Sequence, residues 1–197
     1  MIKYLLICTV LIMSLGIFAC DSDTEREGEA EEAAAQQGNL PGGTVVYQAP
    51  DGWMKEQPSS SMRRAEYRLP GQEGKEDATL AVFFFPGTGG SVQANLDRWY
   101  NQFNQPDGSP TREHVDQQKM EVNGLPVTVV QVNGTFLQGR SMMPNASEEE
   151  KENYAMWAAI VETANGPWFF KAVGPQETIE YWQPQFKEFV QTFAVHP

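Results

Sequence analysis

Residues 115–136 read VDQQKMEVNGLPVTVVQVNGTF, and this stretch decides what kind of sheet the chain can build. Two β-rich runs, Val115 to Glu121 and Leu125 to Phe136, flank the dipeptide Asn123-Gly124, which is a strong signal for a tight hairpin. Strands joined by a hairpin are antiparallel. The sheet that contains them is therefore expected to be largely antiparallel.

Further strands are expected on both sides of this hairpin. Downstream, Tyr154 to Thr163 and Trp168 to Val173 form a second hairpin around an Asn-Gly-Pro turn. Upstream, Thr44 to Gln48 is β-rich, and Met62 to Leu69 alternates charged with apolar residues, so one of its faces should be wet. Ala78 to Phe85 ends apolar on both faces, which places it near the centre of the sheet.

Two segments carry apolar residues at helical spacing. The first begins at Ser91, and its apolar face consists of Val92, Leu96, Trp99, Tyr100 and Phe103. The second follows Gly174-Pro175 and is interrupted at Pro184; its apolar residues are Ile179, Trp182, Phe186, Phe189, Val190 and Phe193. Such helices must cover the apolar surface of the sheet. The sequence thus predicts an α+β fold, in which two helices cover about six to seven strands.

The first 20 residues resemble the signal of a bacterial lipoprotein. Lys3 precedes the apolar run Tyr4 to Ala19, which fits a secretory signal better than a membrane span; a retained membrane anchor is the alternative. Ile17-Phe18-Ala19-Cys20 resembles a lipobox, which implies cleavage after Ala19 and diacylation of the Cys20 sulfur. Two or three acyl chains hold a protein durably on a membrane. We therefore expect a signal peptide over residues 1–19 and a mature protein anchored through Cys20.

Residues 20–43 are expected to form the lipidated cysteine and an acidic, disordered tether. Asp21 to Gly43 contains seven acidic residues against Arg26, and Leu40 is its only large apolar residue. Such a segment cannot bury enough apolar surface to fold. The remaining residues, 44–197, have the length of an ordinary single domain.

Composition argues against several classes of function. The chain has a net charge of −12, and removal of Met1 to Ala19 takes away only Lys3 among the charged residues. So acidic a protein is not expected to bind nucleic acid. Cys8 leaves with the signal and Cys20 carries lipid, so we expect neither a disulfide nor a cysteine-based metal site. His114 and His196 are far apart in sequence, and no metal or cofactor is expected.

Residues 44–193 resemble the PsbP-like family, which is named for an extrinsic subunit of photosystem II. Three segments carry the resemblance: Ala49 to Trp53 after the first strand, Phe85 to Trp99 as strand, glycine loop and helix, and Phe169 to Pro175 before a helix that ends in Phe189 to Phe193. The resemblance implies an α/β/α sandwich. It implies little about chemistry, because members share no catalytic set and bind different partners.

Five residues are candidates for a ligand or partner surface. Arg63, Arg64 and Arg68 would form a positive patch for an anionic partner or lipid headgroup, although ion pairs on the strand surface also explain them. Trp99 and Trp168 would line an apolar pocket between sheet and helix, although both also suit an ordinary core.

Three kinds of function remain open. We expect a lipid-anchored, non-catalytic binding or scaffolding module of the cell envelope that faces the periplasm. It would present a sheet face, or the polar and mobile segment Gln138 to Glu152, to an envelope protein. The alternative is a carrier of a small apolar or anionic ligand in a sheet–helix cleft near Trp99 and Trp168. An enzyme is not expected, because no paired titratable groups occur at a recognisable spacing. The pattern does not decide whether the inner or the outer membrane holds the anchor.

Overall fold

The hairpin around Asn123-Gly124 is present in the computed structural model, which describes residues 40–87, 89–139 and 149–196. Strands β6 (Val115–Val122) and β7 (Leu125–Gln138) pair in antiparallel fashion from Val115 opposite Val132 to Val122 opposite Leu125. Asn123 and Gly124 have φ values of 50° and 79°. Both therefore adopt the left-handed conformation that tight two-residue hairpin turns require.

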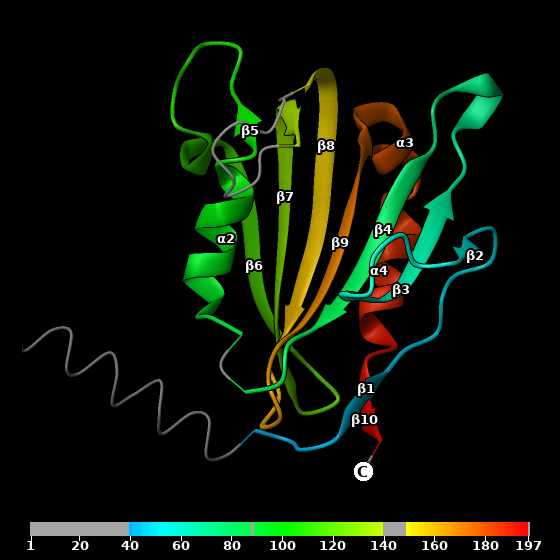
Figure 1. Ribbon diagram of the computed structural model, residues 1–197, viewed down its shortest axis with the longest axis vertical. Helices are drawn as coiled ribbons and strands as arrows, with labels where there is room; N and C mark the ends of the chain where they lie inside the picture. Colours follow the sequence, from blue (N-terminus) through cyan, green and yellow to red (C-terminus); the bar gives the residue numbers. More distant parts are fainter. Residues whose placement is uncertain (1–39, 88, 140–148, 197) are drawn as a thin grey trace, which may run out of the picture. The chain divides into compact units, whose positions relative to one another are not determined.

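Eight strands form one sheet, in which every neighbouring pair is antiparallel (Figure 1). Their order is β2-β3-β4-β9-β8-β7-β5, and β6 also pairs with β7. The bounds are β2 Met54–Glu56, β3 Arg63–Leu69, β4 Ala78–Phe84, β5 Phe103–Asn104, β8 Glu149–Val161 and β9 Trp168–Pro175. The largely antiparallel sheet is confirmed, and β2 and β5 are short strands that the sequence pattern did not indicate.

A separate two-stranded sheet joins the two ends of the domain. Strand β1 (Thr44–Val46) pairs with β10 (Ala194–His196), so that Val45 lies opposite Val195. The strand predicted over Thr44 to Gln48 therefore exists, but its partner is a strand that the sequence did not predict. A three-residue strand is too short to show a period of its own, and this pairing depends on the fold around it.

Helices lie on both faces of the large sheet, which confirms the α/β/α sandwich (Figure 1). Helix α2 (Val92–Tyr100) packs on one face, and α3 (Gln176–Tyr181) and α4 (Gln183–Gln191) pack on the other. Successive residues of a strand point to opposite faces. In β9, Phe169 accordingly joins the cluster under α2, whereas Phe170 joins the cluster under α4.

Helix boundaries follow the expected capping chemistry. The Ser91 hydroxyl accepts a hydrogen bond from the Ala94 backbone N–H at 3.1 Å and caps α2. Pro184 lies in the first turn of α4, where its missing N–H is tolerated, so the predicted interruption is confirmed. Phe103 departs from the prediction, because α2 ends at Tyr100 and Phe103 pairs with Phe136 in the sheet.

The polar segment Gln138 to Glu152 is shorter than predicted. Strand β8 already begins at Glu149, and Glu150 pairs with Leu137 of β7. The prediction of a loop is thus wrong for Gln138, which ends β7, and for Glu149 to Glu152, while residues 140–148 lie outside the described part of the chain. The side chains at the start of β8 are charged and mostly exposed, so this part of the strand shows no alternation of apolar and polar residues. It is a strand because of its backbone pairing, which the sequence pattern does not indicate.

The predicted signal, Cys20 and the tether as far as residue 39 also lie outside the described residues. Within the part that the structure describes, no helix has the length and apolar character to cross a membrane.

Candidate functional site

Arg68 of the predicted positive patch is neutralised by two acidic side chains. Its guanidinium donates to Glu56 Oε1 at 2.8 Å and to Asp77 Oδ2 at 2.9 Å. Arg68, followed by the backbone N–H of Gly71, holds the pKa of Asp77 below its usual value. The ion-pair explanation of Arg68 is therefore the one that the geometry supports.

Arg63 and Arg64 point to opposite faces of the sheet. The Arg63 guanidinium lies 2.5 Å from Glu66 Oε1 and 5.9 Å from the centre of the Phe83 ring, under the α2 side. The Arg64 guanidinium lies 5.7 Å from the centre of the Phe84 ring, on the α4 side. Adjacent residues of a strand point to opposite faces, and the β-bulge between Arg63 and Ala65 puts Arg63, and not Arg64, on the face of Glu66 and Arg68. The three arginines consequently do not form one patch, and Glu66, expected on a wet face, is buried.

Trp99 and Trp168 do not line a common cleft. Trp99 packs edge to face on Phe169 in the cluster under α2, with 5.9 Å between ring centres. Trp168 stacks on Phe84 in the cluster under α4, with 4.8 Å between ring centres. Trp168 and Phe169 are adjacent in β9 and point to opposite faces. The cleft that the sequence suggested near both tryptophans is therefore absent, and both side chains belong to the core.

Lys171 is a cation in the centre of the sheet that the sequence reasoning missed. Its Nζ lies 5.6 Å from the centre of the Trp99 ring and 5.9 Å from that of Phe136, and it donates to the Gln102 side-chain oxygen. Burial is the main cause that lowers the pKa of Lys171 to about 7, and Arg98 and Arg63 lower it further. The available signal was a single basic residue inside the otherwise apolar run 168–173.

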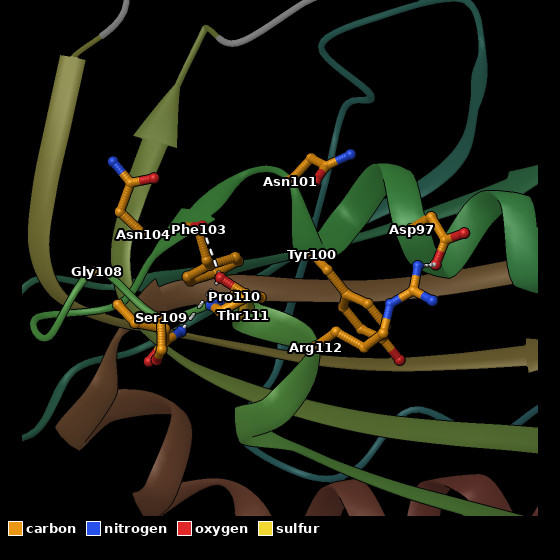
Figure 2. Close-up of a pocket in the computed structure, with 11 residues that line it drawn as sticks. Asp97, Tyr100, Asn101, Phe103, Asn104, Gly108, Ser109, Pro110, Thr111 and Arg112 are labelled. Atoms are coloured by element: carbon orange, nitrogen blue, oxygen red, sulfur yellow. Dashed lines mark hydrogen bonds and ion pairs between the residues drawn. The ribbon is translucent and has the colours of Figure 1, made fainter.

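An open hollow lies between the end of α2 and residues 104–112 (Figure 2). It is an open cavity of about 430 Å³. Hydrogen-bonding side chains dominate its wall: Asp97, Tyr100, Asn101, Asn104, Gln105, Ser109, Thr111 and Arg112. Arg112 donates to Asp97 Oδ1 at 2.6 Å and joins the loop to the helix (Figure 2). We refer to this hollow as the α2 cavity.

Buried contacts fix the loop that forms this cavity. The Thr111 hydroxyl donates to the Phe103 carbonyl oxygen at 2.8 Å, and Gln105 Nε2 donates to the Asn133 carbonyl oxygen at 3.0 Å. Gly134, with φ of 154°, lies so close to the loop that a Cβ atom there would be 2.6 Å from the Asn104 carbonyl oxygen. The cavity wall is therefore held by the sheet beneath it.

Ser109, which lines the α2 cavity, meets His114 and Asp107, but their geometry is not that of a catalytic triad. Ser109 Oγ lies 2.6 Å from His114 Nε2 and donates to Asp107 Oδ1 at 2.6 Å. Asp107 Oδ2 lies 3.9 Å from the same Nε2 atom. In a catalytic triad the carboxylate and the nucleophile form hydrogen bonds with different nitrogens of the histidine ring. Here the serine hydroxyl, followed by the Ser109 backbone N–H, lowers the pKa of Asp107 and stabilises a turn.

A smaller hollow of about 230 Å³ lies between α4 and the strands β6 and β7. Trp157 and Val129 form part of its floor, and Lys187 and Val190 belong to its helical wall. The indole Nε1–H of Trp157 has no hydrogen-bond partner within the described structure, and Lys187 Nζ lies 6.0 Å from the centre of its ring. We refer to this hollow as the α4 groove. It lies between sheet and helix, but away from Trp99 and Trp168, where the sequence suggested a cleft.

A metal site finds no support in the described residues, because no group of three or more His, Cys, Asp or Glu side chains there is placed to hold an ion. The Nε2 atom of His114 already forms a hydrogen bond with the Ser109 hydroxyl. The expectation that the protein uses no metal stays a prediction.

No family model matches this sequence, and the comparison with curated proteins gives no match. Three solved structures illustrate what the fold is similar to. A Pseudomonas aeruginosa protein of unknown function is 12% identical, with 79% of this chain and 99% of that chain covered and a TM-score of 0.46. PsbP from the cyanobacterium Synechocystis is 10% identical, with 77% and 86% covered and a TM-score of 0.46. LpqN of Mycobacterium tuberculosis, involved in cell envelope biogenesis, is 11% identical, with 78% and 84% covered and a TM-score of 0.45.

These structures include a PsbP, the family that the sequence resembles. At such identities and TM-scores, the similarity carries no argument about activity, ligand or partner.

Proposed function

We propose that this protein is a lipid-anchored, non-catalytic binding module of the bacterial cell envelope, and that its ligand is a small polar molecule held in the α2 cavity. The observation that carries the proposal is the cavity itself, an open space of about 430 Å³ with hydrogen-bonding groups on most of its wall. Pockets for small molecules in proteins range from about 300 to 1,000 Å³. The α2 cavity falls within that range.

The cavity wall favours a ligand that both donates and accepts hydrogen bonds. Asn101 and Asn104 each offer an amide with donor and acceptor atoms. Gln105, Thr111 and Ser109 donate to other protein groups and add acceptor oxygens to the wall. An apolar ligand would remove these groups from water without replacing their hydrogen bonds, at a cost of about 1–3 kcal/mol for each. A ligand rich in hydroxyl or amide groups, such as a saccharide unit, would satisfy them.

The local chemistry supports binding without turnover. The Ser109 hydroxyl donates a hydrogen bond to Asp107 and not to His114, so the arrangement does not activate it as a nucleophile. The side chains of His114 and Asp107 are 44% and 63% exposed. Strong electrostatic catalysis requires a site from which water is excluded. An exposed site of this kind excludes little water.

The anchor is tested by the mass of the mature N-terminus. We expect the protein purified from its own membranes to begin at Cys20 and to carry two or three acyl chains, and a Cys20→Ala variant to lack them. An unmodified Cys20 would remove the membrane anchor from the proposal and leave the cavity untouched.

The cavity is tested with a variant that fills it. Asn104 is exposed on the cavity wall, so Asn104→Trp should occupy the space without disturbing the core. Ala94 is exposed on α2 outside the cavity, and Ala94→Trp is the matched control. Full-length proteins purified from their own membranes are extracted, and retained small molecules are identified by mass spectrometry. A polar molecule retained by the wild type and Ala94→Trp, but lost from Asn104→Trp, supports the proposal; equal retention by all three contradicts it.

A second candidate function is a carrier of a partly apolar ligand in the α4 groove. The specific observation is the buried Trp157 indole N–H without a partner beside the Lys187 ammonium, since together they would hold an acceptor group such as a carboxylate. The same extraction decides between the two sites. An amphipathic molecule lost only from Gln118→Trp, which fills the α4 groove, would favour the carrier.

A further inference from the structure

Three cations from three separate elements gather on the sheet face beside α2. They are Lys171 of β9, Arg98 of α2 and Arg63 of β3. The Lys171 ammonium lies over the ring of Trp99, which follows Arg98 in the helix. Arg63 lies over Phe83, the cross-strand partner of Phe169 in β9. Both guanidinium groups act on the Lys171 ammonium by like-charge repulsion.

Among the described residues, one carboxylate, that of Glu66, forms an ion pair with a cation of this cluster. Glu66 lies in the same cross-strand row as Lys171, with Ala81 between them. Its carboxylate accepts from Arg63 at 2.5 Å and from the Ser59 backbone N–H at 2.6 Å. Glu66 therefore compensates Arg63, and no ion pair among the described residues compensates Arg98 or Lys171.

Neutral amides hold the two remaining cations in place. Arg98 donates to the Asn95 side-chain oxygen, and Lys171 donates to the Gln102 side-chain oxygen. Asn95 is 2% exposed, and its Nδ2 donates to the carbonyl oxygens of Gly89 at 3.1 Å and Ser91 at 3.0 Å. These bonds orient the Asn95 oxygen towards Arg98. Arg98 itself is exposed, and this hydrogen bond gives its guanidinium a preferred position.

This arrangement is unusual for the charge of the chain. The sequence carries 26 acidic residues against 14 basic ones, yet among the described residues only one of the three cations in this cluster, Arg63, has a carboxylate partner. Clustered like charges disfavour each other, and burial of an ammonium without a counter-ion adds a further cost. An anion bound at the cluster would offset both costs.

We propose that Lys171, Arg98 and Arg63 form a binding site for an oxyanion, a phosphate or sulfate group, on the sheet face beside α2. Guanidinium groups match such oxyanions with paired, charge-assisted hydrogen bonds, and the ammonium supplies a further donor. The site is distinct from the α2 cavity, since none of its three cations belongs to the wall of that cavity. It stands or falls independently of the proposed polar ligand.

Protonation of Lys171 is linked to anion binding. The charged groups facing its ammonium are Arg98, Arg63 and, across Ala81, Glu66. An anion favours the ammonium form, so loss of that proton weakens binding. Sulfate keeps the same charge from mildly acidic to mildly basic pH, which makes it the probe that reports the lysine alone.

The test is calorimetric titration of the purified full chain with sodium sulfate. Variants Lys171→Met and Arg98→Met each remove one cation of the cluster, and Lys55→Met removes an exposed lysine of β2 as the matched control. We expect about tenfold weaker binding for each cluster variant, the usual effect of losing one hydrogen bond to a charged group, and unchanged binding for Lys55→Met. Wild-type binding should also weaken between about pH 6.5 and about pH 8.5, whereas binding by Lys171→Met should not change over this range.

Two results would overturn the proposal: no binding of millimolar sulfate by the wild type, or equal binding by the wild type and both cluster variants. A second titration identifies the source of the anion. Tighter binding of glycerophosphoglycerol, a soluble phospholipid headgroup, than of inorganic phosphate supports the site as one for a lipid headgroup. The reverse order supports it as a site for a free anion.

Discussion

Replacement of Lys171 by methionine should stabilise the protein at neutral and mildly acidic pH. In the folded protein the pKa of Lys171 is lowered from 10.5 to about 7. Each pKa unit equals about 1.4 kcal/mol, so the charged form of Lys171 destabilises the fold by about 5 kcal/mol. Lys171 retains some exposure to water, which screens part of this cost. We therefore expect Lys171→Met to raise the free energy of unfolding by about 2 kcal/mol at about pH 6.

The sign of the pH dependence follows from proton binding. Between about pH 7 and 10.5, Lys171 is protonated in the unfolded chain and largely neutral in the folded one. The unfolded state then binds more protons, so the free energy of unfolding rises with pH across this window. Below about pH 7 both states are protonated, and the full penalty applies. The advantage of Lys171→Met is thus largest at acidic pH and decreases towards about pH 10.

The assay is urea denaturation of the wild type, Lys171→Met and Lys55→Met in buffers of several pH values that contain neither sulfate nor phosphate. Lys55→Met controls for the loss of one positive charge from an exposed site. The reasoning would be refuted if Lys171→Met were no more stable than Lys55→Met at about pH 6, or if the difference from wild type did not shrink as the pH rises.

Three further predictions concern stability. Phe170 is fully buried and stacks on Phe193 with 4.4 Å between ring centres, so Phe170→Ala should lower the free energy of unfolding by about 3–5 kcal/mol in urea denaturation; a loss below about 1 kcal/mol would contradict this core. Asp77→Asn should lower stability at neutral pH by less than about 1 kcal/mol, because the Arg68 pair is exposed. The lowered pKa of Asp77 means that its contribution is present at neutral pH and lost on acidification, so wild type and variant should converge in strong acid. Ser91→Ala should cost about 1 kcal/mol and speed hydrogen exchange at the start of α2; unchanged exchange there would argue against the cap.

Local sequence signals predicted most of the elements because each one depends on nearby residues alone. Asn123-Gly124 adopts left-handed conformations that few other dipeptides tolerate, and Ser91 caps a helix through its own hydroxyl. The run Ala78 to Phe85, apolar on both faces at its end, likewise indicated a strand inside the sheet, and β4 lies between β3 and β9. The short strands were missed, since β5 contains only Phe103 and Asn104 and exists through its pairing with β7.

The candidate site residues were a different matter, because their roles depend on distant partners. Arg68 was selected for its charge, but Glu56 and Asp77, which neutralise it, lie 12 and nine positions away. Lys171 was overlooked, although its place between Trp99 and Phe136 makes it the more unusual cation. Sequence spacing contains no information about such pairs.

The sequence by itself determined the elements, the antiparallel character of the sheet and the acidic charge, because period, turn chemistry and composition are properties of short stretches of chain. Only the tertiary structure decided that Trp99 and Trp168 lie on opposite faces, that Glu66 is buried, and that Arg98 and Arg63 lower the pKa of Lys171. Whether a charged side chain is paired or left without a counter-ion depends on groups brought together across the sheet. Its electrostatic energy is therefore set by packing that no local pattern records.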